Sequence, residues 1–284
     1  MLDLPDFLPA VTPGLYIVAT PIGNRGDITL RALSVLSKAD IICCEDTRTS
    51  LKLLQTFDIN KPLWSYHDHN GDKIRPKIIQ ALQEKKIIAL ISDAGMPLIS
   101  DPGYKLVRAC YENHLSLITI PGASAVLAGL VLSGMPSDRF MFCGFAQAKD
   151  FGDLKLIPAT LVFFEAPQRL LESVNAMQNS FPDRDIAAVR EITKRFEEVV
   201  FGSYADVIQH FSKQPSIKGE FVIVLSPPKK QVVDNIKIDA ALTRLMQDHS
   251  LKEASQIVAQ TFDLSRKQVY QRALWVKDGK QSDL

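Results

Sequence analysis

Residues 91–103 are Ile91-Ser92-Asp93-Ala94-Gly95-Met96-Pro97-Leu98-Ile99-Ser100-Asp101-Pro102-Gly103, and this stretch is the strongest indication of an α/β fold in the chain. It follows the apolar run 86–91, which is typical of a buried strand, and it ends that strand abruptly with Asp, Ser, Gly and Pro. Backbone amides and a carboxylate therefore stand at the carboxyl end of the strand, which is where ligands bind in an open α/β sheet. Two glycines, two prolines and two aspartates are more than folding alone requires there.

Two more turns of this kind lie in the same half of the chain. The apolar run 15–19 ends in Thr20-Pro21-Ile22-Gly23-Asn24, and the run 117–120 ends in Pro121-Gly122-Ala123-Ser124-Ala125 before a helix-like run begins at Val126. Glycine allows a close backbone approach or a positive φ, while proline fixes φ and removes a donor. Because such turns fall on one edge of a parallel sheet, we expect the three to form the wall of one small-molecule pocket.

Strands and helices alternate regularly around these turns, up to about residue 122. The predicted strands are 15–19, 41–44, 63–66, 87–92 and 117–120. The amphipathic helical runs between them are 29–38, 50–57, 73–84 and 104–112. Short buried strands separated by helices of this length predict a mostly parallel sheet that is covered on both faces.

The rhythm changes past residue 135. The strands predicted there are 140–145, 160–164, 185–190, 197–202 and 221–225, and helices fit residues 168–178 and 204–210. Some of these strands follow one another across short turns, which indicates a mixed sheet in a second α/β domain. The linker Ser226-Pro227-Pro228-Lys229-Lys230 precedes three helical runs, 238–247, 252–261 and 265–276. We therefore predict an N-terminal α/β domain at 13–122, a second at 123–228 and a C-terminal helical module at 229–284.

Composition sets limits on the class of protein. The chain has 284 residues, 46% of them hydrophobic and 23% charged, with a formal net charge of +1. Near-neutral charge argues against indiscriminate coating of nucleic acid, which draws on an excess of Lys and Arg. No run approaches the roughly 18 apolar residues of a membrane span, and the first dozen residues lack the features of a secretion signal. The four cysteines have no metal-ligand spacing, so we expect reduced thiols, no metal and a cytoplasmic protein.

Several charged groups stand at predicted strand ends. Glu45-Asp46-Thr47-Arg48 follows the second strand, and His67 and His69 follow the third. No cysteine or third histidine accompanies the two histidines, so a metal site is rejected, and they are better placed as substrate contacts. The second half contributes Glu165, Arg169, Arg190 and Lys194, among others. The chain has no Ser/His/Asp nucleophile motif, P-loop or GxGxxG fingerprint, so the dinucleotide and nucleoside-triphosphate interpretations lack their key sequence.

Taken together, these loops resemble the tetrapyrrole methylase superfamily, S-adenosylmethionine methyltransferases with two α/β domains and the cofactor cleft between them. Within it the chain is similar to the branch that methylates a cytidine ribose in 16S ribosomal RNA. The residues that carry the resemblance are 19–24, 26–32, 45–48, His67, His69-Asn70, 93–103, Pro121-Gly122, Ser124-Ala125, Arg190-Glu191, Thr193-Lys194 and Lys218-Gly219-Glu220. It extends from about residue 13 to the end. Arg25, Ala123, Ala146-Gln147 and Gln168 depart from the branch's usual residues.

The resemblance implies transfer of a methyl group from S-adenosylmethionine to the 2′-hydroxyl of a cytidine in the decoding region of 16S rRNA, within the small ribosomal subunit. It also implies a homodimer. The residues expected at the cofactor are Pro21, Gly23, Asp93, Ala94, Gly95, Pro97, Ser100, Asp101, Pro121, Gly122, Ala123, Ser124 and Ala125. The candidate general bases are Asp46, His67, His69 and Glu165. The cations expected at RNA phosphates are Arg25, Arg48, Arg169, Arg190 and Lys194.

Three other functions stay open from the sequence. A corrinoid-precursor methyltransferase would use the same cofactor, although the tail after Lys229 and the Glu45–Arg48 motif count against it. A ribosome-assembly binder without catalysis is favoured by Gln168, which replaces a histidine of the branch and cannot exchange a proton. A small-molecule sensor would bind the cofactor without any need for rRNA.

Overall fold

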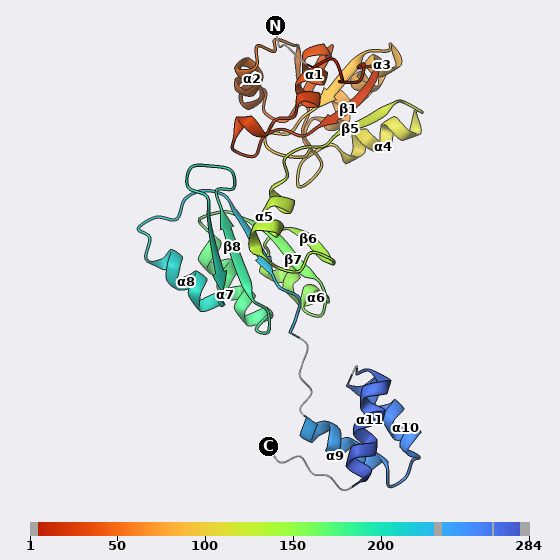
Figure 1. The fold of residues 1–284 in the computed structure, drawn as a ribbon. Coiled ribbons are helices and arrows are strands. Elements are labelled where there is room, and N and C mark those ends of the chain that lie inside the picture. Colours follow the sequence, from red (N-terminus) through yellow and green to blue (C-terminus); the bar gives the residue numbers. More distant parts are fainter. Residues whose placement is uncertain (1–4, 230–234, 263, 279–284) are drawn as a thin grey trace. The chain divides into compact units, whose positions relative to one another are not determined.

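The computed structural model describes residues 5–229, 235–262 and 264–278. By its internal contacts the chain separates into one compact unit, Met1–Pro228, and another, Lys229–Leu284. The first holds two sheets, and the described residues of the second form helices and their connections (Figure 1). Lys230, the last residue of the predicted linker, lies outside the described residues.

The first sheet has five parallel strands in the order β3-β2-β4-β1-β5. The strands are β1 (Gly14–Val18), β2 (Ile41–Cys44), β3 (Leu63–Ser65), β4 (Ile87–Leu90) and β5 (Leu117–Ile120). β1, β2 and β4 are fully or almost fully buried. Their apolar side chains point to both faces, which is the pattern of a parallel sheet covered on both sides. The predicted parallel sheet is confirmed.

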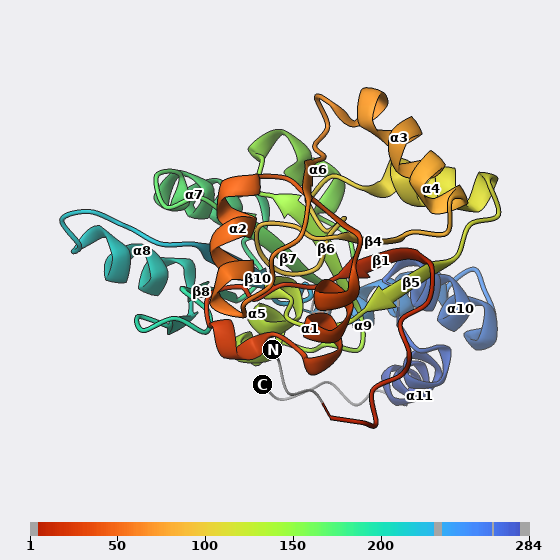
Figure 2. The ribbon, with the colours of Figure 1, turned by 90° about the horizontal axis from the view of Figure 1, so that it is seen from above.

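Helices cover the two faces of this sheet in pairs (Figure 2). They are α1 (Leu30–Lys38), α2 (Thr47–Thr56), α3 (Gly71–Gln83) and α4 (Tyr104–Glu112), with the short helix η1 (Arg25–Asp27) before α1. Leu36 of α1 and Leu54 of α2 share one core, while Ile78 of α3 and Leu106 of α4 belong to the other. The neighbouring strands β1 and β4 therefore lead to helices on opposite faces. At such a switch point the loops diverge and leave a crevice at the carboxyl ends of the strands.

The second sheet is mixed, as expected, in the order β6-β7-β10-β8-β9. Its strands are β6 (Phe140–Phe145), β7 (Thr160–Glu165), β8 (Ile186–Arg190), β9 (Glu198–Gly202) and β10 (Phe221–Leu225). β6 and β7 are parallel, and the remaining neighbours are antiparallel. The helices of this half are α5 (Ala125–Ser133), η2 (Ala148–Asp150), α6 (Phe151–Leu154), α7 (Leu170–Ser180) and α8 (Tyr204–Ser212).

Helix α5 covers one face of the second sheet, and α6, α7 and α8 cover the other. Val126 and Leu130 of α5 pack against Val222 in the centre of the sheet. Gly129 makes this approach close, since a Cβ there would lie only 2.6 Å from Val222 Cγ1. α5 directly follows β5, so the same segment leaves the first sheet and begins the core of the second.

Some boundaries differ from the sequence-based prediction. The strand predicted at 87–92 ends at Leu90, and the helix predicted to begin at residue 50 begins at Thr47. The side chain of Asp46 causes the second difference, because it caps α2 by accepting a hydrogen bond of 2.8 Å from the Arg48 amide. Arg48 thus belongs to the first turn of a helix.

The second compact unit is a small helical bundle. Its helices are α9 (Asn235–Leu245), α10 (Leu251–Thr261) and α11 (Arg266–Lys277), and the three predicted helical runs are confirmed. Leu242, Val258 and Ala273, one from each helix, lie in a shared core. A capping box between Ser250 and Glu253 begins α10. No helix in the described parts of the chain is long and apolar enough to cross a membrane.

Candidate functional site

The three turns predicted to lie together do meet at the carboxyl edge of the first sheet. The Thr20 amide donates to the Gly95 carbonyl at 2.8 Å, and the Gly95 amide donates to the Thr20 carbonyl at 3.1 Å. Gly95 has a φ of +79°, and a Cβ there would lie 3.2 Å from Ile22 Cγ2 and 3.7 Å from the Ala123 carbonyl oxygen. A larger residue at this position would therefore be strained and would push the turns apart.

A cavity of about 400 Å³ opens beside these turns and is also lined by the second sheet. Eight residues predicted for the site lie in its lining: Asp93, Ala94, Gly95, Ser100, Asp101, Ser124, Ala125 and Glu165. The other lining residues were not assigned to the cofactor: Ile22, Met96 and Ile99 lie in the predicted turns, whereas Val126, Phe145, Phe164, Ala166, Pro167, Ile192, Glu220, Phe221 and Val222 belong to the second half. Most of these are apolar and belong to the second half, where the pattern indicates only a hydrophobic core.

The charged residues in the lining of the cavity are all acidic. It contains four carboxylates, those of Asp93, Asp101, Glu165 and Glu220, and no Lys or Arg. The remaining side chains are mostly apolar. A cavity of this kind favours a ligand with an apolar body and positive charge, because carboxylates in a partly desolvated site attract cations more strongly than they do in water.

Two of these carboxyls have raised pKa values. Burial raises the pKa of Asp101 to about 6, with smaller contributions from the negative charges of Glu45 and Asp93, against a hydrogen bond from Ser92 that lowers it. Burial also raises the pKa of Asp93, whose Oδ1 accepts a hydrogen bond of 3.3 Å from the Asp46 amide. Both groups are therefore easier to protonate than ordinary aspartates and would gain from a bound cation.

The N-terminus of α5 supplies a different kind of group. Ser124 is the N-cap residue, its side chain makes no capping hydrogen bond, and Ser124, Ala125 and Val126 all line the cavity. The first amides of a helix carry partial positive charge and bind anions. The cavity thus combines carboxylates with one helix N-terminus, which suits a ligand that carries charges of both signs.

Six residues expected at the cofactor are not in the lining: Pro21, Gly23, Pro97, Pro121, Gly122 and Ala123. Two of them hold loops together. A Cβ at Gly122 would lie 2.9 Å from Ala19 Cβ, and one at Gly23 would lie 2.6 Å from Lys194 Cγ. These glycines permit close packing beside the cavity, and their contact with a cofactor stays a prediction.

Of the four candidate bases, Glu165 is the one in the cavity lining. Its side chain is fully buried, and both carboxylate oxygens are already engaged. Oε1 accepts from the Ala166 amide at 2.7 Å and from Arg169 Nε at 2.9 Å, while Oε2 accepts from the Ser173 hydroxyl. Glu165 therefore organises the turn after β7 and has little free capacity to take a proton.

The other three candidates lie after β2 and β3. Asp46 accepts two hydrogen bonds from the Arg48 guanidinium, and this contact lowers its pKa to about 2. His69 is exposed. His67 is half-buried, and its Nδ1 is buried with no hydrogen-bond partner among the described residues. Burial and the negative charge of Asp93 raise the pKa of Glu45, and His67 lowers it.

Four of the five cations expected at RNA phosphates already have acidic partners. Arg48 pairs with Asp46 at 2.8 Å, Arg169 with Glu165 at 2.9 Å, and Arg190 with Glu198 at 2.8 Å. Lys194 pairs with both Glu191 and Glu220, at 2.9 and 2.8 Å. Arg25 is exposed and has no ion pair within the part of the chain that the structure describes. Their contact with RNA stays a prediction.

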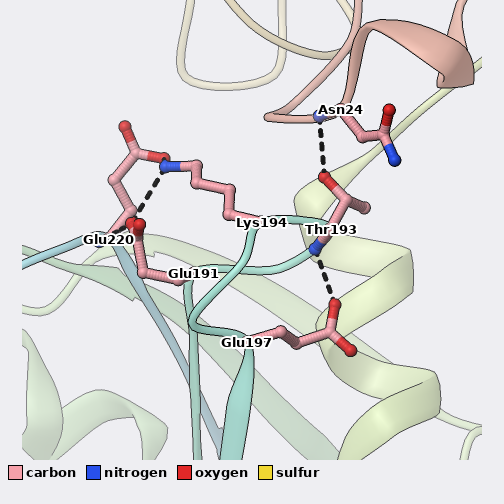
Figure 3. A network of polar contacts seen from close by, with 6 residues as sticks. All are labelled: Asn24, Glu191, Thr193, Lys194, Glu197 and Glu220. Carbon is pink, nitrogen blue, oxygen red and sulfur yellow. Dashed lines mark hydrogen bonds and ion pairs between the residues drawn. The ribbon is translucent and has the colours of Figure 1, made fainter.

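Lys194 pairs with Glu191 and Glu220, and the neighbouring Thr193 makes a contact between the two halves of the first compact unit (Figure 3). The Thr193 hydroxyl accepts a hydrogen bond of 3.1 Å from the Asn24 amide, and the Thr193 amide donates to Glu197 at 2.6 Å (Figure 3). Thr193 and Glu191 have positive φ values of 67° and 53°. A β-branched residue is strained in this conformation, so the surrounding contacts must hold it there.

Comparison with known proteins identifies the family. Residues 14–208 match the model of the Tetrapyrrole (Corrin/Porphyrin) Methylases, and residues 233–276 match the RsmI C-terminal HTH domain. Ribosomal RNA small subunit methyltransferase I of Mesorhizobium japonicum is 43% identical over 94% of this chain and 93% of its own length. The protein of that name from Erythrobacter litoralis is 46% identical over 94% of this chain and 96% of its own. The chain therefore belongs to the tetrapyrrole methylase family and, within it, to the family of ribosomal RNA small subunit methyltransferase I.

Solved structures support the fold. Diphthine synthase is 15% identical, with a TM-score of 0.60 over 75% of this chain and 89% of its own. Uroporphyrin-III C-methyltransferase of Thermus thermophilus, in complex with S-adenosylhomocysteine, is 16% identical, with a TM-score of 0.52 over 75% of this chain and 97% of its own. The two-sheet fold is thus that of known methylases. Among the described residues, no group of three or more His, Cys, Asp and Glu is arranged to hold a metal ion.

Proposed function

We propose that this protein is an S-adenosylmethionine-dependent rRNA methyltransferase that acts on the ribose 2′-hydroxyl of a cytidine in the decoding region of 16S rRNA. The observation that carries the proposal is the cavity at the switch-point turns, whose lining combines Asp93 and Asp101, which have no ion pair among the described residues, with the N-terminus of α5. The names of relatives at 43% and 46% identity support ribosomal RNA as the substrate.

The cavity fits the cofactor in volume and in charge. About 400 Å³ lies within the usual range of small-molecule sites. S-adenosylmethionine has a flat adenine ring, whose faces match the mostly apolar lining, and a sulfonium and an ammonium, which match its carboxylates. Asp93, Asp101 and Glu220 would balance its positive charges, and the amides after Ser124 would bind its carboxylate. When bound, the sulfonium supplies an already activated methyl group.

The protein residues then have two tasks, which are to align the acceptor and to receive its proton. A 2′-hydroxyl is a poor nucleophile, so a general base within hydrogen-bond reach would help. Asp46 is held by Arg48, and the oxygens of Glu165 are engaged. Among the four candidates, His67 combines a half-buried position with a buried ring nitrogen that has no partner in the described structure. We therefore favour His67 for the proton and Glu165 for holding the turn that borders the cavity.

The C-terminal unit supports a nucleic acid substrate over a corrinoid. Helices α10 and α11 lie in the stretch that matches the HTH domain model. Helix-turn-helix units typically place their second helix against a nucleic acid. Lys267, Tyr270 and Gln271 are exposed on α11, at spacings that put them on one side of the helix. A tetrapyrrole substrate would have no use for such a unit.

Exposed apolar side chains support the proposed homodimer. Leu127 and Val131 of α5 are 52% and 77% exposed, and Phe140, Met141 and Phe145 of the edge strand β6 are each more than 40% exposed. Large apolar residues that remain exposed in this number mark protein interfaces. Sedimentation velocity of the full chain tests this part of the proposal, and a monomer at micromolar concentration would contradict it.

The decisive experiment uses small ribosomal subunits from cells that lack this gene. The purified protein and labelled S-adenosylmethionine should transfer label to 16S rRNA, and mapping of alkali-resistant linkages should place it on one cytidine ribose in the decoding region. A corrinoid precursor in place of the subunits should remain unlabelled. Label on the corrinoid would favour a tetrapyrrole methyltransferase, and RNA binding without any methyl product would favour an assembly factor.

A further inference from the structure

A second hollow of about 630 Å³ lies in the second half of the first compact unit. We call it the β8–β9 hollow, because the connection between these two strands forms much of its wall. Its lining includes Arg190, Arg195, Phe196, Glu198, Gln214 and Lys218. None of these residues lines the cavity described above, and only Arg190 was predicted to bind RNA.

The carboxylates of the β8–β9 hollow are already engaged. Glu198 pairs with Arg190 at 2.8 Å and lies 3.1 Å from His210. Glu191 pairs with Lys194, and Glu197 accepts a hydrogen bond from the Thr193 amide. Arg195 and Lys218, in contrast, have no ion pair within the part of the chain that the structure describes. The hollow therefore retains two cations that are available to an anion.

Phe196 adds a surface for stacking. Its side chain is 69% exposed, and the Arg195 guanidinium carbon lies 5.7 Å from the centroid of its ring. An exposed phenylalanine at the tip of a connection contributes nothing to a core. A flat ring beside a guanidinium is the combination on which proteins stack unpaired nucleobases, and the neighbouring cations then meet the phosphates.

The hollow is continuous along the chain with the cavity. Glu191 lines the hollow and its neighbour Ile192 lines the cavity, while Gly219 and its neighbour Glu220 are divided in the same way. The network around Lys194 lies between the two (Figure 3). A strand whose acceptor ribose is at the cavity would therefore reach the hollow within a short distance.

We propose that the β8–β9 hollow binds a nucleotide of single-stranded RNA next to the one that is methylated. The base stacks on Phe196, and the adjoining phosphates contact Arg195 and Lys218. This inference rests on the proposed function, because it assigns a site to the RNA that the enzyme methylates. It explains why two unpaired cations and an exposed aromatic ring stand together beside a cavity that has no cation of its own.

The test compares four variants of the full chain on unmethylated small subunits. Phe196→Ala should raise KM for the subunits about tenfold, the order of one lost base stack, while Phe196→Trp should keep KM near its original value. The double variant Arg195→Gln/Lys218→Gln should lower the slope of log KM against log salt by about 1.4, at about 0.7 for each phosphate contact. Phe201→Ala is the matched control, since Phe201 is 59% exposed on β9 but does not line the hollow.

Two further measurements separate the inference from the proposed function. Calorimetry should give the same Kd for S-adenosylmethionine in all variants, and fluorescence anisotropy should show weaker binding of a single-stranded RNA to Phe196→Ala. If Phe196→Ala and Phe201→Ala behave alike toward RNA, the inference is wrong even where the original protein methylates rRNA. If the original protein methylates nothing while Phe196→Ala still weakens RNA binding, the proposed function fails, and the hollow remains a site for single-stranded RNA that is not next to a methylated nucleotide.

Discussion

The cavity and the β8–β9 hollow lie on either side of one side-chain network, yet they differ in charge. The cavity has four carboxylates and no Lys or Arg, whereas the hollow has cations and carboxylates together. In the hollow Glu191 and Glu198 have cationic partners and Glu197 accepts from a backbone amide, while Arg195 and Lys218 have no ion pair among the described residues, so two cations remain available to an anion. Counting charged residues does not reveal this difference, because what a ligand meets is the charge left after internal pairing.

The largest effect is expected from Gly95→Val, which should affect the cavity and leave the hollow intact. A valine at φ +79° is strained, and its Cβ would lie 3.2 Å from Ile22 Cγ2. We expect a loss of roughly 1–3 kcal/mol in the free energy of unfolding and at least a hundredfold weaker binding of S-adenosylmethionine. Denaturant unfolding and calorimetry measure the two.

Gly134→Val is the matched control for this substitution. Gly134 has a φ of +66°, but no atom lies within 4 Å of a Cβ built there, and it does not line the cavity. Its variant should lose similar stability and keep its affinity for the cofactor. Equal loss of cofactor affinity in both variants would show that the turn at Gly95 has no special place in the site.

Lys194→Met should affect both the cavity and the hollow, because Lys194 pairs with Glu220 in the cavity lining and with Glu191 in the hollow. Removal of the ammonium leaves the exposed Glu220 carboxylate without its ion pair and leaves Glu191 with the hydrogen bond from the Glu220 amide, which should cost about 1 kcal/mol in unfolding free energy. Affinity for the cofactor and KM for the subunits should both worsen severalfold. Lys86→Met, which breaks an exposed pair with Glu84, should do neither.

If Lys194→Met changes only the affinity for the cofactor or only the KM for the subunits, the expected coupling between the cavity and the hollow is contradicted. Such a result would mean that the network does not connect the cavity and the hollow and that each holds its shape alone.

The smallest effect is expected from Asp101→Asn, and it depends on pH. Because the pKa of Asp101 is raised to about 6, its carboxyl is ionised above that pH and attracts the cationic cofactor, and it is neutral below it. Affinity for S-adenosylmethionine should therefore fall about threefold from pH 7.5 to pH 5, the size of one solvent-screened charge–charge interaction of roughly 0.7 kcal/mol. Calorimetry across this range should give a flat profile for Asp101→Asn.

The same shift predicts the sign of the effect on stability. A raised carboxyl pKa means that the folded protein disfavours the ionised form, so the destabilisation by Asp101 is absent below its ordinary pKa of 3.8, grows from there to about pH 6 and is complete above it. Asp101→Asn should therefore raise the Tm at pH 7.5 while it weakens cofactor binding. A lower Tm at that pH would contradict the assignment of burial as the cause.

The order of helices and strands could be predicted from the sequence, because apolar runs and amphipathic periods are local signals. The runs at 41–44, 117–120, 140–145 and 221–225 became strands with those bounds. The start of α2 was not accessible in the same way, because it depends on a cap by Asp46 that competes with the apolar period. The division of the first compact unit at residue 122 stays a prediction.

The site was accessible only in part. Glycine and proline at strand ends mark turns, so the residues from 93 to 101 and at 124–125 were found. Phe164 and Phe221 were missed, because an apolar residue in a strand has the same pattern whether it faces a core or a cavity. The pairing of cations was also missed, since Lys194 and Glu220 are 26 positions apart and only the fold brings them together.

The positive φ of Thr193 coincides with a hydrogen bond that depends on its side chain. A glycine would adopt its left-handed backbone without strain, but it would lack the hydroxyl that accepts the Asn24 amide across the two halves. Backbone strain at Thr193 is thus held together with a hydrogen bond that joins residues 169 positions apart, and a glycine would give up both.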